Sequence, residues 1–397
     1  MLKFCCDPIE TVKVGFIGLG IRGIKAVERF QHIKGVKIVA LCDRDKKTLE
    51  VAYENLQKRQ SVIASTDWKE ICETADIDLI YISTDWLSHT EIAVYAMQQG
   101  KHVAVEVPAA FSVEECWQLV DTAEQTRKHC MMLENCCYDE FELNTLNMLR
   151  QGVFGEVVHG EGAYIHDLRS LNFPPTSTSK KGMRRADFAM KYAGNIYPTH
   201  GLGPICVAMN IHRGDKMNYL VSMSSKQWGI SDYALKNYGE NSEEYKRKYR
   251  LGDMNTTLIY TELGKTIMLQ HDVNNPRPYS RIHAVTALNG YFCKYPAPQI
   301  AVSADGFLPD KEMEELLKKY EHPFITEYGK QAKKISGDRF FDFIMDSRLI
   351  YCLQNGLPLD MNVYDAAAWS CITELSEISV KNGSAPVEIP DFTRGKF

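Results

Sequence analysis

Three glycines near the start of the chain have the spacing that binds the phosphates of a dinucleotide. They are Gly18, Gly20 and Gly23, and they follow the apolar run Val12 to Ile17. Gly18 suits a tight turn, Gly20 lets a pyrophosphate approach the backbone, and Gly23 lets a helix pack closely on a strand. The N-terminus of that helix favours negative charge. The pattern therefore predicts a dinucleotide-binding turn.

One acidic residue indicates which dinucleotide is bound. A second apolar run, Val36 to Cys42, ends at Asp43, twenty residues beyond Gly23. A carboxylate at this strand end accepts hydrogen bonds from ribose hydroxyls and repels a 2′-phosphate. Asp43 therefore favours NAD over NADP, although Arg44, the next residue, could in principle hold that phosphate.

Strands and helices continue to alternate after this turn. The apolar patterns predict strands at Leu79–Ser83, His102–Glu106 and Cys130–Glu134, a helix at His89–Gln99, and a helix capped by Ser112 with Glu115 in a capping box. Such alternation predicts an α/β fold, an N-terminal Rossmann domain with a doubly wound parallel sheet. Ligands of this fold lie at the carboxyl ends of the strands.

The second half of the chain has a different pattern. We expect strands at Glu156–His166, Met217–Lys226, Thr256–Glu262, Thr266–Asp272 and Arg281–Leu288, and helices at Arg339–Leu353 and Tyr364–Ser379. The turn Leu263-Gly264-Lys265 indicates a hairpin, and Leu171–Gly182 reads as a surface loop. The expectation is a Rossmann domain at 1–135 and an α+β domain with a largely antiparallel open sheet at 136–397. The last helices of the chain would pack back on the first domain.

Composition limits the classes of partner. The 397 residues carry a net charge of -5 and no basic stripe, so nucleic acid is not expected as a partner. No apolar stretch is long enough to span a bilayer, and Met1–Glu10 does not resemble a signal peptide, so we expect a cytoplasmic protein. A leader removed beforehand would leave the same sequence. The twelve cysteines predict reduced, buried thiols, and their spacing predicts no metal site.

Beyond the glycine pattern, four segments carry a resemblance to a known family. They are His102–Ala110, Glu134–Tyr138, Tyr197–Pro204 and Asn218–Ser225. With the antiparallel second half, they make the chain resemble the glucose–fructose oxidoreductase/inositol dehydrogenase (Gfo/Idh/MocA) family. Within it, almost the entire chain is similar to the NAD-dependent glycosidases of glycoside hydrolase family 109, whose founding activity is α-N-acetylgalactosaminidase.

Two positions depart from the dehydrogenases of that larger family. Those relatives carry a lysine where this chain has Val107, and an aspartate in the region of Tyr197, whereas their histidine is kept as His200. The proton-handling pair is thus altered, as in the glycosidase branch. The resemblance implies that NAD takes hydride from C3 of the sugar, which acidifies the C2 proton. The C1 leaving group is then expelled, water adds, and the hydride returns.

The resemblance also implies roles for individual residues. The cofactor contacts would come from Gly18, Gly20, Ile21, Arg22, Gly23, Asp43, Trp86, Leu87, Ser88, His89, Glu106, Val107, Asn135, Tyr197, Pro198, Thr199 and His200. Tyr164, Tyr197 and Tyr279 would contact the substrate, a small glycoside. His200 would accept the proton of the C3 hydroxyl, and Tyr197 would transfer the C2 proton. His166 and Arg169 stay undecided.

Two other functions remain open at this point. A conventional NAD-linked sugar or inositol dehydrogenase shares the fold and the cofactor, and accumulating NADH would distinguish it. In a non-catalytic NAD-binding protein, substitution of His200 and Tyr197 would leave no turnover to change. The sugar and its anomer stay open as well. The second sheet has one face to cover, so we expect a homo-oligomer.

Overall fold

The computed structural model of this protein describes residues 1–57, 61–173 and 180–397. The side chains of residues 57 and 180–184 are not described. The chain forms two compact units, each of which is made from separate segments. The first unit contains residues 1–143, 321–370 and 392–396, and the second contains 144–320, 371–391 and 397.

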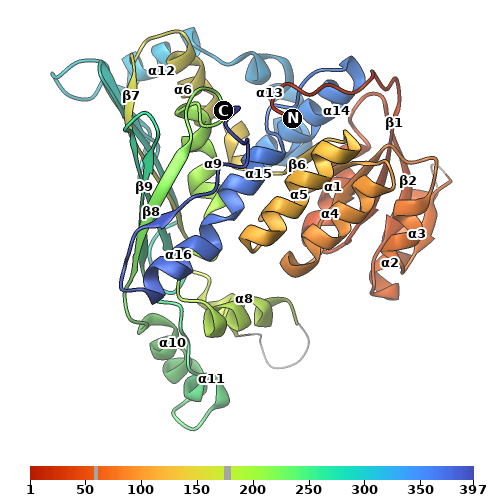
Figure 1. Ribbon diagram of the computed structural model, residues 1–397, viewed down its shortest axis with the longest axis horizontal. Coiled ribbons are helices and arrows are strands. Elements are labelled where there is room, and N and C mark those ends of the chain that lie inside the picture. The colour runs from red at the N-terminus through yellow and green to blue at the C-terminus, as the bar shows by residue number, and fades with distance from the viewer. Residues whose placement is uncertain (58–60, 174–179) are drawn as a thin grey trace. The chain divides into compact units, whose positions relative to one another are not determined.

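The first unit is built on a six-stranded parallel sheet with the strand order β3-β2-β1-β4-β5-β6 (Figure 1). The strands are β1 (Val12–Ile17), β2 (Val36–Cys42), β3 (Ile63–Ser65), β4 (Leu79–Ile82), β5 (His102–Val105) and β6 (Cys130–Met132). The central strands β4 and β5 are buried at every residue, which is why they appear in the sequence as continuous apolar runs. The predicted Rossmann fold is confirmed.

Helices of the first unit come from both ends of the chain. They are α1 (Ile21–Phe30), α2 (Lys46–Gln57), α3 (Trp68–Glu73), η1 (Trp86–Ser88), α4 (His89–Gln98), α5 (Val113–Thr126), η2 (Asn135–Tyr138), α13 (Pro323–Ser336), η3 (Gly337–Arg339), α14 (Phe340–Asn355) and α15 (Val363–Ser370). The predicted capping box of α5 is confirmed, because Ser112 and Glu115 satisfy each other's backbone amides. The late helix α15 packs on α5 and β6.

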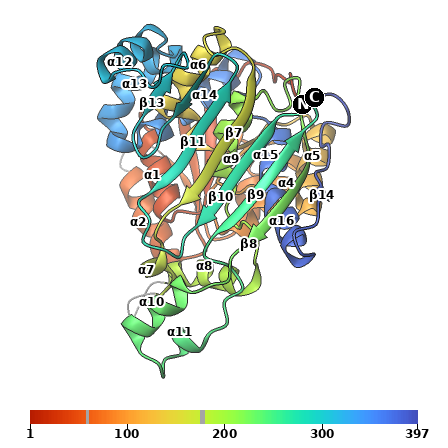
Figure 2. The same cartoon turned by 90° about the vertical axis from the view of Figure 1, so that its left-hand side faces the viewer.

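The second unit is built on an eight-stranded sheet with the order β13-β12-β11-β7-β10-β9-β8-β14 (Figure 2). Its strands are β7 (Val157–Ile165), β8 (Met217–Ser224), β9 (Asn255–Thr261), β10 (Thr266–Asp272), β11 (Ser280–Ala287), β12 (Gly290–Cys293), β13 (Gln299–Ala301) and β14 (Val387–Glu388). All pairs are antiparallel except β7 with β10. The predicted hairpin between β9 and β10 is confirmed.

Helices cover one face of this sheet. The remaining helices of the chain are α6 (Glu140–Arg150), α7 (Arg169–Asn172), α8 (Lys180–Lys191), α9 (Thr199–Ala208), α10 (Gly229–Tyr238), α11 (Glu243–Lys246), α12 (Asp310–Lys319) and α16 (Ile372–Lys381). Helix α9 packs on β7 and α16 packs on β8. The approach of α9 requires glycines, because a Cβ added to Gly162 would lie 2.2 Å from the carbonyl oxygen of Gly201.

Two predicted elements are wrong in part. The single helix expected at 364–379 is interrupted at Cys371, where the chain leaves the first unit and enters the second. The loop expected at 171–182 includes the end of α7 and the start of α8, while its positions 174–179 lie outside the described residues. An amphipathic pattern alone gives no signal for the interruption at Cys371, because it depends on which unit each half of the segment packs against.

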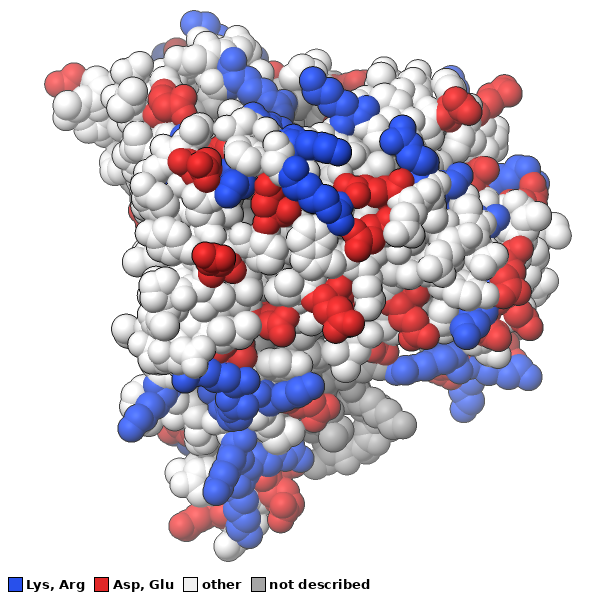
Figure 3. All heavy atoms as spheres, in the orientation of Figure 1, with Lys and Arg blue, Asp and Glu red and all other residues white. Residues whose placement is uncertain are grey.

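Surface chemistry agrees with the composition. Acidic and basic side chains are mixed over the face shown in Figure 3. Ten of the twelve cysteines are buried, so the prediction of buried thiols is wrong only for Cys5 and Cys6. Within 1–57, 61–173 and 180–397, no helix has the length and apolar character needed to cross a bilayer.

Candidate active site

In the first unit, the predicted glycine turn has the geometry of a phosphate cradle. Gly18 has φ +91°, and a Cβ on it would lie 2.6 Å from the carbonyl oxygen of Ser83. A Cβ on Gly23 would lie 1.9 Å from the carbonyl oxygen of Gly18. A Cβ on Gly20, by contrast, would meet no described atom within 4 Å. Two glycines thus allow the turn to close, and the third leaves open space at the helix N-terminus where a pyrophosphate fits.

Asp43 lies against this turn. One of its carboxylate oxygens accepts a hydrogen bond of 2.7 Å from the backbone amide of Leu19, and the other accepts one of 2.8 Å from Asp45. These two amides fix the orientation of the carboxylate at the end of β2. Arg44 is exposed and forms a 3.5 Å ion pair with Asp85.

The segment after β4 carries four predicted cofactor residues. His89 is buried, and its ring nitrogens lie 2.8 Å from the carbonyl oxygen of Pro108 and 3.3 Å from that of Thr84. Burial lowers the pKa of His89, so the ring is neutral and can donate a hydrogen bond to one of these two carbonyl oxygens. The indole of Trp86 stacks on Phe111 at 6.1 Å. Ser88 is half-buried, and Leu87 is 59% exposed, as Ile21 is at 62%, so these two apolar side chains are available for contact.

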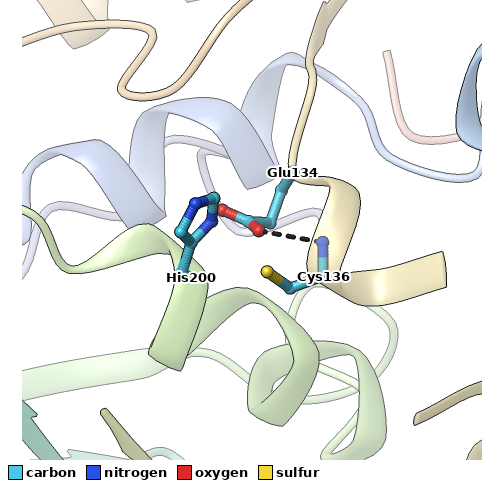
Figure 4. Close-up of side chains that lie close together, drawn as sticks. All are labelled: Glu134, Cys136 and His200. Carbon is cyan, nitrogen blue, oxygen red and sulfur yellow. Dashed lines mark hydrogen bonds between the residues drawn. The ribbon is translucent and has the colours of Figure 1, made fainter. Parts of the chain in front are cut away.

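The ends of β5 and β6 supply the other cofactor candidates of this unit. Glu106 is buried, and its Oε1 accepts a 2.8 Å hydrogen bond from Nε of Arg22. Val107 is buried where dehydrogenases of the wider family carry a lysine. Asn135 begins η2, directly after the buried Glu134, whose carboxylate accepts a 3.2 Å hydrogen bond from the amide of Cys136 (Figure 4).

The second unit brings together the predicted substrate and catalytic residues. Tyr164, near the end of β7, lies with its ring 4.7 Å from that of Tyr197 and 5.6 Å from that of His200. The hydroxyl of Tyr197 lies 3.4 Å from Nε2 of His200. Tyr164 and Tyr197 are each only 7% exposed. A phenol and an imidazole at this distance can exchange a proton.

Tyr279 and His166 extend this cluster. The ring of Tyr279 lies 6.4 Å from Tyr164 and 5.1 Å from His166, in T-shaped contacts. The Tyr164 hydroxyl lies 3.3 Å from Nδ1 of His166. Tyr279 is 40% exposed, so its ring is accessible to a ligand. Arg169, which was undecided from the sequence, forms a two-point ion pair with Asp167.

A network of buried hydrogen bonds holds the segment that carries Tyr197. The carboxylate of Glu377 accepts hydrogen bonds from the amides of Ala193 and Gly194, the latter at 2.8 Å. The amide of Asn195 donates to Ser376 at 2.9 Å. The side chain of Asn195 in turn accepts from the amide of Tyr197 at 3.0 Å. Pro198 caps α9 and the buried Thr199 begins it, so His200 lies in the first turn of that helix.

Three residues near this cluster were not predicted from the sequence. His271 on β10 pairs in register with Tyr164, and their rings stack at 6.3 Å. Burial, followed by the charge of Arg185, lowers the pKa of His271 to about 3. The guanidinium of Arg185 lies 5.2 Å from the ring of Tyr197, and Nη1 of Arg281 donates to the Tyr279 hydroxyl at 3.2 Å. His271 was missed because the sequence does not show that β10 pairs in parallel with β7.

The bulged start of β11 positions Arg281. The register between β11 and β7 shifts at Ile282, which has φ +58°, and His283 follows with φ +49°. A β-branched residue with positive φ is an outlier that marks local strain, and such bulges often lie beside functional sites. Taken together, the predicted site residues form two groups. One group, from Gly18 to Asn135, lies in the first unit, and the other, from Tyr164 to Tyr279, lies in the second.

Both halves of the chain match models of known protein families. Residues 12–134 match the model "Oxidoreductase family, NAD-binding Rossmann fold". Residues 138–397 match the model "Glycosyl hydrolase 109, C-terminal domain". The chain is 55% identical to an alpha-N-acetylgalactosaminidase of Bacteroides fragilis, covering all of this chain and 95% of that protein. It is 53% identical to a glycosyl hydrolase family 109 protein of Phocaeicola vulgatus, covering 100% and 98%.

Solved structures agree on the fold. Levoglucosan dehydrogenase in complex with NADH and L-sorbose has a TM-score of 0.74 at 15% identity, over 96% of this chain and all of that one. Apo scyllo-inositol dehydrogenase from Lactobacillus casei has a TM-score of 0.69 at 15% identity, over 96% and 99%. The predicted family resemblance is confirmed, and with it NAD as the cofactor and glycoside hydrolysis as the reaction class. The chain belongs to glycoside hydrolase family 109.

Proposed function

We propose that this enzyme hydrolyses α-N-acetylgalactosaminides at the cluster of Tyr164, Tyr197 and His200. The main support for this proposal is that the ring centroids of these three side chains lie within 5.6 Å of one another. Proton transfer requires side chains that are this close together. The substrate class is suggested by the relative named alpha-N-acetylgalactosaminidase, at 55% identity. No pair of carboxylates is required for this route, unlike in ordinary glycosidases.

NAD would be held by the predicted cofactor residues of the first unit. They are Gly18, Gly20, Ile21, Arg22, Gly23, Asp43, Trp86, Leu87, Ser88, His89, Glu106, Val107 and Asn135. The open space at Gly20 and the fixed carboxylate of Asp43 fit the pyrophosphate and the adenosine ribose. When bound, NAD supplies reversible hydride removal at C3 of the sugar and is not consumed.

The protein's own groups would then move protons. His200 would accept the proton of the C3 hydroxyl, because a ring nitrogen of imidazole can act as a base. Tyr197, whose hydroxyl is within reach of His200, would transfer the proton at C2. Tyr164 and the half-exposed Tyr279 would bind the sugar ring through their aromatic faces and hydroxyls. Arg281 would orient Tyr279 through its 3.2 Å hydrogen bond.

The test is nitrophenol release from a panel of α- and β-linked aryl glycosides that includes the N-acetylgalactosaminide. NADH absorbance is followed in the same cuvette. We expect many turnovers of nitrophenol without accumulating NADH, fastest with the α-N-acetylgalactosaminide. Steady NADH production with the glycosidic bond intact would instead identify a sugar dehydrogenase. If nitrophenol is released from a different glycoside and not from the α-N-acetylgalactosaminide, the proposed substrate is wrong but the proposed mechanism stands.

We further propose that the enzyme is a cytoplasmic homo-oligomer that associates through the uncovered face of the second sheet. Tyr219, Met223, Leu258 and Tyr260 are 39–65% exposed on neighbouring strands β8 and β9. Exposed apolar patches of this kind favour contact with another protein surface. Light scattering on the wild type and on Leu258→Glu should give a larger mass for the wild type.

The cytoplasmic location is supported by the cysteines, because a chain with ten buried thiols suits a reducing compartment. Fractionation of the source cell tests this location.

A further inference from the structure

A buried carboxylate in the first unit connects two of the proposed cofactor residues. Asp342, in the first turn of α14, is 1% exposed. Its Oδ2 accepts a 3.0 Å hydrogen bond from Nη1 of Arg22, and its Oδ1 accepts one of 2.5 Å from the side-chain amide of Asn135. Arg22 belongs to the first turn of α1, and Asn135 follows β6. One side chain therefore contacts two separate parts of the proposed NAD site.

Arg22 is paired with two carboxylates in this arrangement. Nε and Nη2 lie 2.8 and 2.7 Å from Oε1 of Glu106, while Nη1 faces Asp342. The group is thus held between the end of β5 and the start of α14, and it has few alternative rotamers. A paired guanidinium of fixed direction loses little conformational entropy when it meets a ligand.

Further charges keep Asp342 ionised. Burial alone would raise its pKa, but Arg22, Arg29 and Arg339 together hold the pKa well below its usual range. Nε of Arg339 donates at 3.0 Å, and Nη1 of Arg29 lies at 3.6 Å. A buried carboxylate is tolerated when it is paired and hydrogen-bonded in this way. The ionised form is the one that can accept from Arg22 and Asn135 at once.

We propose that Asp342 is a positioning residue for NAD binding, which holds Arg22 and Asn135 in the orientation that the cofactor meets. The inference rests on the proposed cofactor roles of these two residues. Asp342 lies 320 residues from Arg22 in the sequence, and among the described residues it hydrogen-bonds Arg22 and Asn135 of the proposed cofactor site. Its removal should therefore lower affinity for NAD more than the loss of stability alone explains.

Asp346 provides a matched control one turn further along α14. It is also fully buried, and it pairs with Nε of Arg29 at 2.6 Å. Among the residues that the structure describes, its hydrogen-bond partner is Arg29, and it bonds neither Arg22 nor Asn135. Asp342→Asn and Asp346→Asn thus remove the same charge from the same helix, but only the first changes a contact of the proposed cofactor residues.

The experiment measures the Kd for NAD by isothermal titration and the thermal unfolding of the cofactor-free protein. We expect Asp342→Asn to raise Kd about tenfold or more, and Asp346→Asn to leave Kd within about twofold, although both lower the unfolding temperature. Asp342→Glu keeps the charge but displaces the carboxylate, so it should fold and still bind NAD more weakly. Unchanged affinity in either folded Asp342 variant, or an equal loss in Asp346→Asn, would overturn the proposal. Failure of the wild type to bind NAD would refute the proposed function instead.

Discussion

The hydroxyl of Tyr197 lies 3.4 Å from Nε2 of His200, at the start of α9, and the two rings meet at right angles with centroids 5.1 Å apart. Sequence separation of three residues across a helix start produces this approach, because Tyr197 precedes the N-cap residue Pro198 and His200 lies in the first turn. The pair combines a phenol hydroxyl with an imidazole, and both groups can donate and accept a proton. It is therefore the part of the cluster in which a single substitution should be most informative.

Replacement of either member should lower turnover strongly. We expect His200→Asn and Tyr197→Phe each to lower kcat for the aryl glycoside by about 10²–10⁴-fold, the usual range for loss of a general acid or base. Nitrophenol release at saturating NAD measures this. His159→Asn, on a half-buried histidine of β7 outside the cluster, should leave kcat unchanged. Equal kcat in all three variants would exclude the pair from proton transfer.

The glycine turn allows stability to be separated from cofactor binding. Gly20→Ala places a methyl group where no described atom lies within 4 Å, so the protein should fold normally but bind NAD at least about tenfold more weakly. Gly23→Ala places it 1.9 Å from the Gly18 carbonyl oxygen, so both stability and NAD binding should be lost. Thermal unfolding and NAD titration of both variants test this. Normal NAD affinity in Gly20→Ala would show that the cofactor does not approach there.

Much of the first unit follows from the sequence. Strands β1 and β2 begin and end where the predicted runs do, because each is buried and free of charged side chains after the lysine at its second position. Strand β3 was missed, since it has three residues and Ile63 and Ala64 are exposed. Short edge strands such as β14 are likewise determined by their partner strand, which the local sequence does not contain.

Site residues could be predicted where they belong to a family motif, but not where contacts between distant parts of the chain position them. Tyr164, Tyr197 and His200 were found through family motifs, whereas Arg281 meets Tyr279 only because β11 is bulged. Asp342 and Asp346 were not predicted as site residues. Their spacing of four residues within an apolar helix was the available signal for buried ion pairs. The domain boundary at 135/136 and the roles of the site residues stay predictions.

Acid should destabilise the first unit through its buried histidines. Burial lowers the pKa of His102 to about 3 and that of His129 to about 4, and Nδ1 of His102 accepts a hydrogen bond from the amide of His129. An unfolded histidine titrates near 6.5, so the unfolded state binds more protons between about pH 6.5 and pH 4. The free energy of unfolding should therefore fall as the pH drops through this window.

Substitution isolates this contribution. His102→Gln keeps an acceptor for the His129 amide but binds no proton, so it should reduce the slope of unfolding free energy against pH by up to about 1.4 kcal/mol per pH unit. Urea unfolding at pH 5, 6 and 7 gives the slope. His32→Gln, at an exposed histidine, should leave it as in the wild type. An unaltered slope in His102→Gln would mean that His102 does not stay neutral in the folded protein.

Glu377 should affect both stability and turnover, because it holds the segment that leads to Tyr197. Its buried carboxylate accepts from the amides of Ala193 and Gly194 and pairs with Arg250 at 3.2 Å. Glu377→Gln should cost about 2–4 kcal/mol in the free energy of unfolding, since it weakens charge-assisted hydrogen bonds and leaves buried donors poorly paired. We also expect a lower kcat, because Tyr197 would be less well positioned.

Lys381→Gln is the control for this prediction. Lys381 forms a 3.0 Å ion pair with the same carboxylate, but its side chain is 52% exposed, so the loss should stay below about 1 kcal/mol and kcat should not change. Urea unfolding and nitrophenol release well below the unfolding temperature test both variants. If Glu377→Gln is destabilised but keeps the wild-type kcat, Glu377 supports the fold of the second unit without positioning Tyr197. A reduced kcat that returns in Glu377→Asp would tie the effect to the carboxylate itself.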